Sequence, residues 1–273
     1  MAHHPAGSAI QTRLRVVTWN LWWQFGPWRE RAPAISAALA DIDADIIALQ
    51  EVWDDGAECF SRQLAVDLGF HHVYAPGAKP NGIHMGNAIV SRWPISSSEI
   101  IALFGQQGAE ENRVAIYAEI EGPRGKIPVF STHLNWQQHH SHIRQNQVAD
   151  LAKFIDATRP WKVPPILCGD FNADPVSTEI QMLTGQTTCP VENLVFHDAW
   201  EFKHPVKPGF TWDRINPYVA ENFDPDRRID YIFVGPAKGN GVGHIVDCQI
   251  VGNKPIDGIW PSDHHAVLAE LRY

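Results

Sequence analysis

Short apolar runs alternate with polar turns along the whole chain. The runs have the length, the β-branched content and the flanking Gly or Pro residues that are typical of strands. They predict nine strands, at residues 14–19, 45–50, 87–91, 113–120, 127–132, 164–169, 228–234, 244–251 and 266–271. Between some of these runs, apolar residues recur three and four positions apart, which predicts helices at 28–42, 57–69 and 140–157.

The order of these elements indicates how the layers are arranged. Strands joined by short turns occur together with strands joined by helices, so the sheets should contain both parallel and antiparallel neighbours. Two packed sheets with helices outside them fit this order better than one doubly wound sheet. Because no repeat, linker or low-complexity tract divides the chain, we expect a flexible segment at 1–12 and a single domain at 13–273.

Composition and charge narrow the classes of protein. Hydrophobic residues make up 44% of the chain and charged residues 19%, a balance typical of globular proteins. The net charge of -9 and the lack of a Lys/Arg run weigh against a protein that grips long duplex DNA. No stretch reaches the ~20 apolar residues of a membrane-spanning helix, and the first residues lack the apolar run of a secretory signal. We therefore expect a cytoplasmic protein without a spanning segment; the oligomeric state is left open.

Polar residues that can bind a metal or move a proton interrupt or follow the apolar runs. They are Asn20, Glu51, His133 and Asp170 with Asn172 after four strands, Asp230 within another, and Asp263 with His264 before the last. A carboxylate at a half-buried strand end is unfavourable unless it is compensated, and a metal ion compensates it well. Singly, each residue has a simpler explanation, such as a solvated strand end or an Asx-turn. The ordered series instead predicts a catalytic site.

This series resembles the endonuclease/exonuclease/phosphatase superfamily. The matching segments are TWN (18–20), LQEV (49–52), GNAIVSRWPI (86–95), STHL (131–134), GDFNADP (169–175), FTWD (210–213), RIDYIFV (228–234) and SDHHAV (262–267). The resemblance covers almost the full chain. It implies the DNase I-like α/β fold, a four-layer sandwich of two packed mixed β-sheets flanked by helices. It also implies a metal-dependent hydrolase of phosphate esters with Mg²⁺ or Mn²⁺ as cofactor.

The resemblance assigns metal-binding and water-positioning roles to the first group of residues. Glu51 matches the main metal ligand, with Asn20 beside it, and Asp263 matches a further ligand of the metal or of its water. Asp170 and Asn172 match the pair that orients the attacking water and holds the phosphoryl oxygens. Carboxylate and amide oxygens are also the ligands that Mg²⁺ prefers.

The other matched residues imply proton transfer and substrate contact. His264 matches the proton-transfer residue, Asp230 the carboxylate that orients it, and His133 a second imidazole that stabilises the transition state. An imidazole with a pKa of ~6.5 can accept a proton at neutral pH, which suits this role. Arg113 lies where several members place a phosphate-contacting arginine. Trp136 and Trp212 flank the predicted site and are candidate substrate-binding residues, and Arg144 with Gln147 should support the His133 loop.

The leading hypothesis is hydrolysis of a phosphate mono- or diester by direct attack of an activated water. One alternative is a nuclease or DNA-end-processing enzyme, because the FTWD segment resembles the tyrosyl-DNA phosphodiesterase branch. A second is a sphingomyelinase-like lipid phosphodiesterase, and a third is a non-catalytic binding module on the same fold. The substrate can accordingly be a small molecule, a lipid headgroup or a nucleic-acid end, and the surface loops that select it match nothing diagnostic.

Overall fold

The computed structural model describes residues 12–105, 112–221 and 224–273, and their strands form two six-stranded sheets. Across the first sheet the order is β11 (Ile245–Val251), β12 (Ala266–Arg272), β1 (Arg13–Asn20), β2 (Ile46–Asp54), β4 (His84–Ser91) and β3 (His71–Ala78). Across the second it is β5 (Ile95–Ala102), β6 (Val114–Gly122), β7 (Gly125–His133), β8 (Ile166–Asp170), β10 (Asp230–Val234) and β9 (His197–Asp198). The pairs β1–β2 and β7–β8 are parallel and their neighbours are antiparallel, so both sheets are mixed, as predicted.

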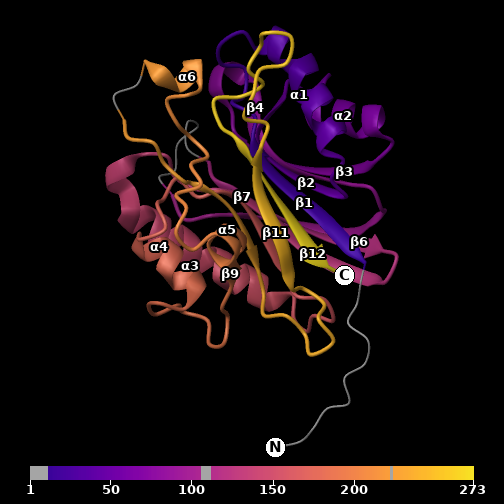
Figure 1. Cartoon of the computed structure of the whole chain (residues 1–273), viewed down its shortest axis with the longest axis vertical. Helices are drawn as coiled ribbons and strands as arrows, with labels where there is room; N and C mark the ends of the chain where they lie inside the picture. Colours follow the sequence, from indigo (N-terminus) through magenta and orange to yellow (C-terminus); the bar gives the residue numbers. More distant parts are fainter. Residues whose placement is uncertain (1–11, 106–111, 222–223) are drawn as a thin grey trace, which may run out of the picture.

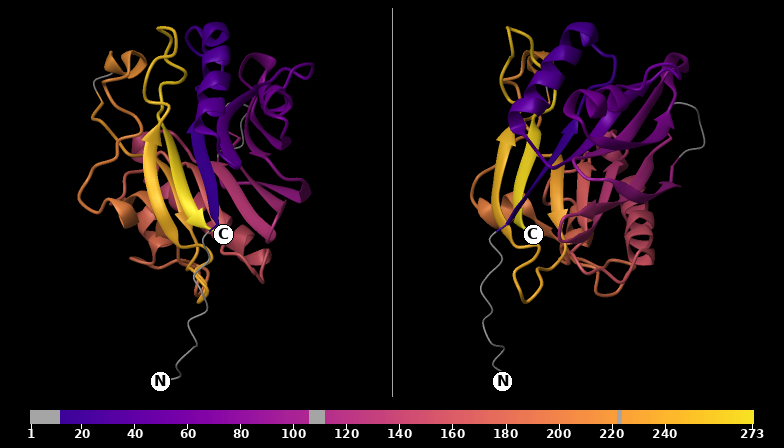
Figure 2. Two further views of the ribbon diagram at one scale, coloured as in Figure 1. Left: turned by 45° about the vertical axis from the view of Figure 1, so that its right-hand side comes forward. Right: turned by 90° about the vertical axis from the view of Figure 1, so that its right-hand side faces the viewer.

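Helices cover the outer face of each sheet (Figures 1 and 2). The longer ones are α1 (Trp28–Ile42) and α2 (Phe60–Leu68) on the first sheet, and α3 (Ser141–Ala157) and α4 (Thr178–Thr184) on the second. Shorter helical segments are η1 (Pro80–Gly82), η2 (Gln138–His140), α5 (Ala199–Lys203) and α6 (Pro217–Ala220). The four-layer sandwich expected from the sequence is confirmed.

Successive side chains of a strand point to opposite faces of its sheet, so the two sheets together form three apolar layers. Val16 faces the core between the two sheets, whereas Val17 faces the layer that contains α1. In the second sheet, Ile166 faces the same central core and Leu167 faces α3. Strands buried on both faces have no polar side, which explains why the sequence shows uninterrupted apolar runs instead of strict alternation.

All nine predicted strands and all three predicted helices are present, with bounds shifted by a few residues at most. The strands β3, β5 and β9 were not predicted. Each lies at an end of a sheet or is only two residues long, and most of β5 is exposed. An exposed edge strand does not need an apolar sequence, so hydrophobicity gives little signal for it.

The predicted flexible segment at 1–12 falls almost wholly on residues 1–11, which lie outside the described residues. At residue 12 the backbone already pairs with the other end of the chain, since Tyr273 donates its N–H to Thr12 O at 3.1 Å. Among the described residues, no helix combines the length and the apolar character that crossing a membrane requires.

Candidate active site

The strand ends that carry the candidate residues meet because of the way the strands pair. The β7–β8 register places His133 opposite Asp170, and the β8–β10 register places Asp170 opposite Asp230. In the other sheet, the last residue of β1, Asn20, lies beside the residue that precedes Glu51 in β2. The two sheets join here, since Asn20 Nδ2 donates to Asp170 Oδ2 at 2.9 Å.

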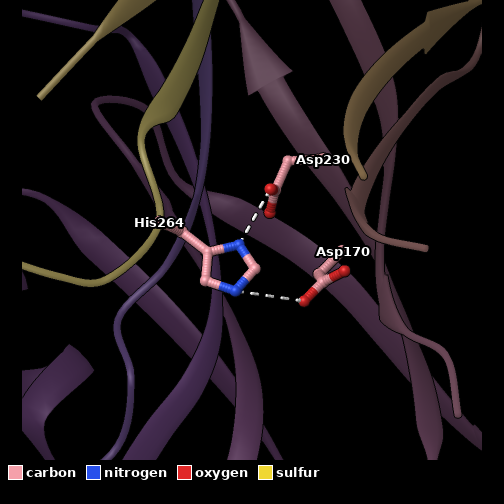
Figure 3. Close-up of side chains that lie close together, drawn as sticks. All are labelled: Asp170, Asp230 and His264. Carbon is pink, nitrogen blue, oxygen red and sulfur yellow. Dashed lines mark hydrogen bonds and ion pairs between the residues drawn. The ribbon is translucent and has the colours of Figure 1, made fainter. Parts of the chain in front are cut away.

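A buried histidine lies between two aspartates at the centre of the site (Figure 3). His264 Nδ1 is 2.9 Å from Asp230 Oδ2, and His264 Nε2 is 3.8 Å from Asp170 Oδ2. All three side chains are buried. The first distance is a hydrogen bond, whereas the second exceeds hydrogen-bond length and leaves Nε2 directed at Asp170 without a direct bond.

The carboxylates around His264 decide its proton affinity. Burial alone would lower the pKa of this imidazole, but the charges of Asp230 and Asp263 and the hydrogen bond to Asp230 raise that pKa well above its usual value. Burial and the charge of Asp230 also raise the pKa of the Asp170 carboxyl group, to about 6. The cluster therefore holds a proton-accepting ring beside a carboxylate that is itself unusually basic.

Thr211, which the sequence analysis did not single out, holds the backbone at Asp230 and next to His264. Its Oγ1 accepts the backbone N–H groups of Ile229 and Asp230 at 3.1 and 3.2 Å. Its carbonyl accepts the N–H of His265 at 2.6 Å. The FTWD segment thus joins the start of β10 to the start of β12. His265 points to a different partner, with its Nε2 3.2 Å from Asp213 Oδ1, as the alternation of a strand predicts.

Glu51 enters the site at a bulge in β2. The β2–β4 register shifts between Leu49 and Val52, and Glu51 has a left-handed backbone with φ of 53°. For a residue with a Cβ this conformation costs roughly 1–2 kcal/mol, so the surrounding structure must hold it. The bulge redirects the Glu51 carboxylate towards Asn20, whose Nδ2 donates to Oε1 at 3.3 Å.

The chemistry of Glu51 fits a bound cation. Its Oε2 is buried, and no hydrogen-bond partner for it occurs among the described residues. Burial and the charge of Asp263 raise the pKa of Glu51 to about 7, and burial also raises the pKa of Asp263. Two partly buried carboxyl groups whose charged forms are disfavoured are relieved by a divalent ion, which prefers such oxygens. The residues present therefore fit a hard metal ion at Glu51 and Asp263.

A second group of atoms is also compact enough for an ion, since ligand atoms of Asp170, Asp230 and His264 lie within 4.8 Å of one another. The nitrogen that faces Asp230 is already engaged in a 2.9 Å hydrogen bond. A metal there would have to replace that bond and accept an imidazole in place of the oxygen ligands that Mg²⁺ prefers. The geometry of this group fits proton transfer better than metal binding.

Asn20 connects the carboxylates of the two sheets. Its amide nitrogen donates to Asp170 and Glu51, and its Oδ1 accepts the N–H of Trp22 at 2.9 Å. The predicted role as metal ligand requires the amide oxygen, which in this arrangement is turned towards the loop that follows β1. Asn20 lies beside Glu51 in either orientation.

His133 has a cation where His264 has a carboxylate. Arg113 Nη1 is 2.9 Å from His133 Nδ1, and His133 Nε2 is 3.5 Å from Asp170 Oδ2 and 3.9 Å from Glu51 Oε1. Burial and the Arg113 charge lower the pKa of His133 well below its usual value. Because a guanidinium can only donate, Nδ1 must accept, and the neutral ring carries its proton on Nε2, facing the two carboxylates.

The GDFN segment makes a sharp turn after β8. Gly169 has φ of 155°, and a Cβ at this position would come within 2.2 Å of Thr132 O on β7. Asn172 has φ of 49°, and its N–H donates to Asp170 Oδ1 at 2.8 Å, as in an Asx-turn. Its side-chain nitrogen donates to Leu134 O at 3.2 Å. The turn and the candidate site are therefore the same feature.

Arg31 is a further residue that the sequence analysis missed. Its guanidinium is buried in α1 and donates to Pro261 O and to the carbonyls of the loop after β1, among them Leu21 and Trp22. Burial lowers its pKa to about 10. The available signal was position, because Arg31 precedes Ile35 by four residues and so lies on the apolar face of the predicted helix.

The remaining predicted residues lie around this centre. Arg144 donates to Gln137 O at 2.7 Å, and Gln147 Oε1 accepts the N–H of Asn135 at 2.9 Å, so both support the loop after His133, as expected. Trp136 in this loop is 57% exposed. Trp212 is half-buried, and its backbone pairs with that of Arg227.

Comparison with known proteins identifies the family. A model of the "Endonuclease/Exonuclease/phosphatase family" matches residues 17–264, and the chain belongs to that family. Members of this family hydrolyse phosphoesters and generally use a divalent metal. The predicted resemblance is confirmed.

Individual relatives differ in what their names describe. The chain is 26% identical to the Drosophila melanogaster protein named "Putative neutral sphingomyelinase" across 95% of its length, and 27% identical to the Schizosaccharomyces pombe "Inositol phosphosphingolipids phospholipase C" across 82%. It spans 60% of the length of each of these relatives. The fold is similar to that of D. rerio TDP2 complexed with a single-strand DNA product, with a TM-score of 0.76, 20% identity, and coverage of 96% of this chain and 100% of the other.

Proposed function

We propose that this phosphoesterase uses Mg²⁺ or Mn²⁺ to hydrolyse a phosphate mono- or diester by direct attack of an activated water. One observation carries the proposal. The buried His264 ring lies between Asp230 and Asp170, and the same centre contains Glu51 with an oxygen that has no partner among the described residues. Proton transfer and metal binding are thereby assigned to separate groups of one site.

Glu51 and Asp263 would hold the metal, with Asn20 beside them. A divalent ion there would neutralise charge that develops on the phosphoryl oxygens and lower the pKa of a bound water. The chain prepares this position with two partly buried carboxyl groups whose pKa values are raised. Arg31 holds the loop after Asn20 and the segment before Asp263 in place through its carbonyl contacts.

His264 would accept the proton of the attacking water. In its neutral form the ring donates Nδ1–H to Asp230, and its Nε2 presents a lone pair on the side that faces Asp170, 3.8 Å away. Asp170 would orient that water, and Asp230 would stabilise the imidazolium that forms. General base catalysis of this kind commonly contributes on the order of 10²–10⁴ in rate.

His133 and Asn172 would contact the phosphoryl group. The Nε2–H of His133 is a neutral donor that faces the carboxylates where the phosphate would bind, and Asn172 is oriented by Leu134 O. We propose that Arg113 acts on the substrate through His133, whose Nδ1 it contacts. Trp136 and Trp212 remain proposed substrate contacts at the edge of the site.

The finer assignments have unequal support. A nuclease or DNA-end-processing activity is supported only by likeness of fold, whereas a sphingomyelinase-like activity is supported by relatives whose names describe sphingolipid hydrolysis. A single domain at 13–273 and a cytoplasmic location are proposals that rest on the sequence alone.

A panel of phosphoesters tests the proposed function. Purified protein is assayed on a chromogenic diester, a chromogenic monoester, sphingomyelin, a 5′-tyrosyl oligonucleotide and supercoiled plasmid, with Mg²⁺, Mn²⁺ or chelator. We expect metal-dependent hydrolysis of a small or terminal phosphoester and weak plasmid nicking, because gripping a duplex neutralises several phosphates. Plasmid nicking that is faster than diester hydrolysis and falls steeply with salt would contradict this preference. Activity that persists fully in chelator would contradict the metal-dependent mechanism.

A further inference from the structure

Four large apolar side chains are exposed on loops that adjoin the catalytic strand ends. We call them the apolar rim: Phe25 (45% exposed), Trp136 (57%), Val176 (81%) and Ile215 (77%). The first three follow Asn20, His133 and Asp170 by only three to six residues. Ile215 lies in the loop that leads to Asp230. Large apolar side chains gathered around one site are a feature of surfaces that bind a partner or a membrane.

Contacts between the loops place the rim around one centre. The Trp22 ring lies 4.7 Å from the Tyr218 ring, which brings the Phe25 loop against the Ile215 loop. Arg227 Nη2 donates to Asp174 Oδ2 at 3.0 Å, which joins the Val176 loop to the segment before β10. In Figures 1 and 2, α6 and the start of α1 project at the same end of the molecule.

The charges on these loops do not favour a polyanion. Arg214 pairs with Asp226 at 2.9 Å, and Arg227 pairs with Asp174 at 3.0 Å. Each of these cations is already matched by a carboxylate on the same set of loops. A protein that binds a nucleic acid needs unpaired cations to replace the counterions of the phosphates. A partner whose surface has zero net charge makes no such demand.

The side-chain types of the apolar rim distinguish between two remaining partners, unpaired nucleic-acid bases and a lipid surface. Unpaired nucleic-acid bases bind chiefly by stacking on aromatic faces. The two most exposed rim residues, Val176 and Ile215, are aliphatic and offer no such face. Aliphatic side chains together with a tryptophan suit the boundary between lipid headgroups and acyl chains, where an indole can keep its ring in the apolar region and its N–H in water.

We propose that the apolar rim docks the active site onto a zwitterionic phospholipid surface, so that the phosphodiester of a headgroup reaches His264 and Glu51. This inference rests on the proposed function and names its substrate class. The ion pairs on the same loops, Arg214 with Asp226 and Arg227 with Asp174, match a headgroup that carries one cation and one anion. The rim residues enter the lipid boundary while the polar centre stays at headgroup level.

The first test measures binding without turnover. The His264→Ala protein is sedimented with vesicles of phosphatidylcholine and sphingomyelin in the presence of Mg²⁺. Adding Val176→Ser and Ile215→Ser should reduce the bound fraction at least tenfold, since each removes apolar surface that the lipid boundary would bury. The matched control is Val206→Ser, because Val206 is 93% exposed but lies next to α5 and β11, where His204 Nε2 contacts Cys248 O. Vesicle binding by this control should equal that of the parent.

Three outcomes would overturn the inference. The first is vesicle binding that is unchanged by the rim substitutions or equally reduced by Val206→Ser. The second is binding of a single-stranded oligonucleotide, but not of vesicles, that depends on the rim. The third is a rim-dependent dimer, seen by light scattering, with no vesicle binding.

A second measurement separates this inference from the proposed function. The rim substitutions in the otherwise wild-type chain should lower hydrolysis of vesicle sphingomyelin more than hydrolysis of a water-soluble diester. Equal losses on both substrates would contradict docking while leaving the phosphodiesterase mechanism intact. Conversely, rim-dependent vesicle binding by a protein that hydrolyses no phosphoester with any metal would contradict the proposed function alone.

Discussion

Two buried histidines at the same site have opposite surroundings. His264 has Asp230 at its Nδ1, and the neighbouring carboxylates overcome the effect of burial to raise its pKa. His133 has Arg113 at its Nδ1, and burial together with that charge lowers its pKa. Both rings direct Nε2 towards Asp170. The residue that contacts Nδ1 therefore determines the role of each histidine: Asp230 favours proton acceptance by His264, and Arg113 favours a neutral His133 that donates from Nε2.

The largest loss of kcat is expected from substitutions at His264 and Asp230. His264→Ala and Asp230→Asn should each reduce kcat, the first by roughly 10²–10⁴. Because the two residues act as one unit, the double variant should be little worse than His264→Ala. Turnover of the three variants on a chromogenic diester measures this. A double variant that loses the product of the two single losses would show that the residues act independently.

The next effect concerns the His133 side. His133→Ala should lower kcat by roughly 10²–10³ if its Nε2–H is a transition-state donor. Arg113→Gln should then lower kcat with little change in KM, because Arg113 acts by fixing the ring. A large rise in KM at constant kcat would instead indicate that Arg113 contacts the substrate directly. The chemical shifts of ¹⁵N-labelled His133 report whether the proton lies on Nε2.

Glu51 Oε1 lies 3.9 Å from His133 Nε2, and substitution of Glu51 tests the metal. Glu51→Gln should raise the Mg²⁺ concentration needed for half-maximal activity by roughly 10–100-fold. The fold should remain intact, and the metal-free variant should be at least as stable as wild type, because a buried charge is removed. Metal binding is measured by calorimetry and stability by urea unfolding in chelator. Unchanged Mg²⁺ affinity would rule out Glu51 as a ligand.

The two rings should also influence stability with opposite dependence on pH. A lowered pKa means that unfolded His133 binds a proton more readily than folded His133, so its contribution is lost as pH falls below ~6.5. The raised pKa of His264 stabilises the fold below ~6.5, and this contribution is lost as pH rises through the folded pKa. In chelator, His133→Gln should flatten the acid limb, and His264→Gln should destabilise most at acid pH. Each slope is at most about 1.4 kcal/mol per pH unit.

The smallest effect on chemistry is expected at His265. Its ring pairs with Asp213 and not with Asp230, so His265→Ala should change kcat by less than about twofold. Loss of the buried pair should still destabilise the fold, by roughly 1–3 kcal/mol. A kcat loss as large as that of His264→Ala, measured well below the melting temperature, would mean that the two adjacent rings do not have separate roles.

Much of the architecture was predictable from sequence because the central strands are buried on both faces. Runs such as 164–169 must be apolar throughout, and most of the nine predicted strands have that feature. The edge strands β3 and β5 were not predicted, since an exposed edge strand is stabilised by backbone pairing with its neighbour, which no local sequence pattern reveals. Short segments such as α6 depend on a cap, here the side chain of Asn216, more than on periodicity.

The amino-acid sequence was enough to show which polar residues interrupt or flank the buried strands, and so which residues were candidates for the site. Which of these side chains face each other depends on the folded chain. Contacts such as Arg113 with His133, Arg31 with Pro261 O, or Thr211 with Asp230 join residues 19 to 230 positions apart. Their partners depend on strand register and on the Glu51 bulge, which redirect side chains by whole faces of a sheet. Since a pKa depends on those partners, the opposite characters of His133 and His264 follow from the fold.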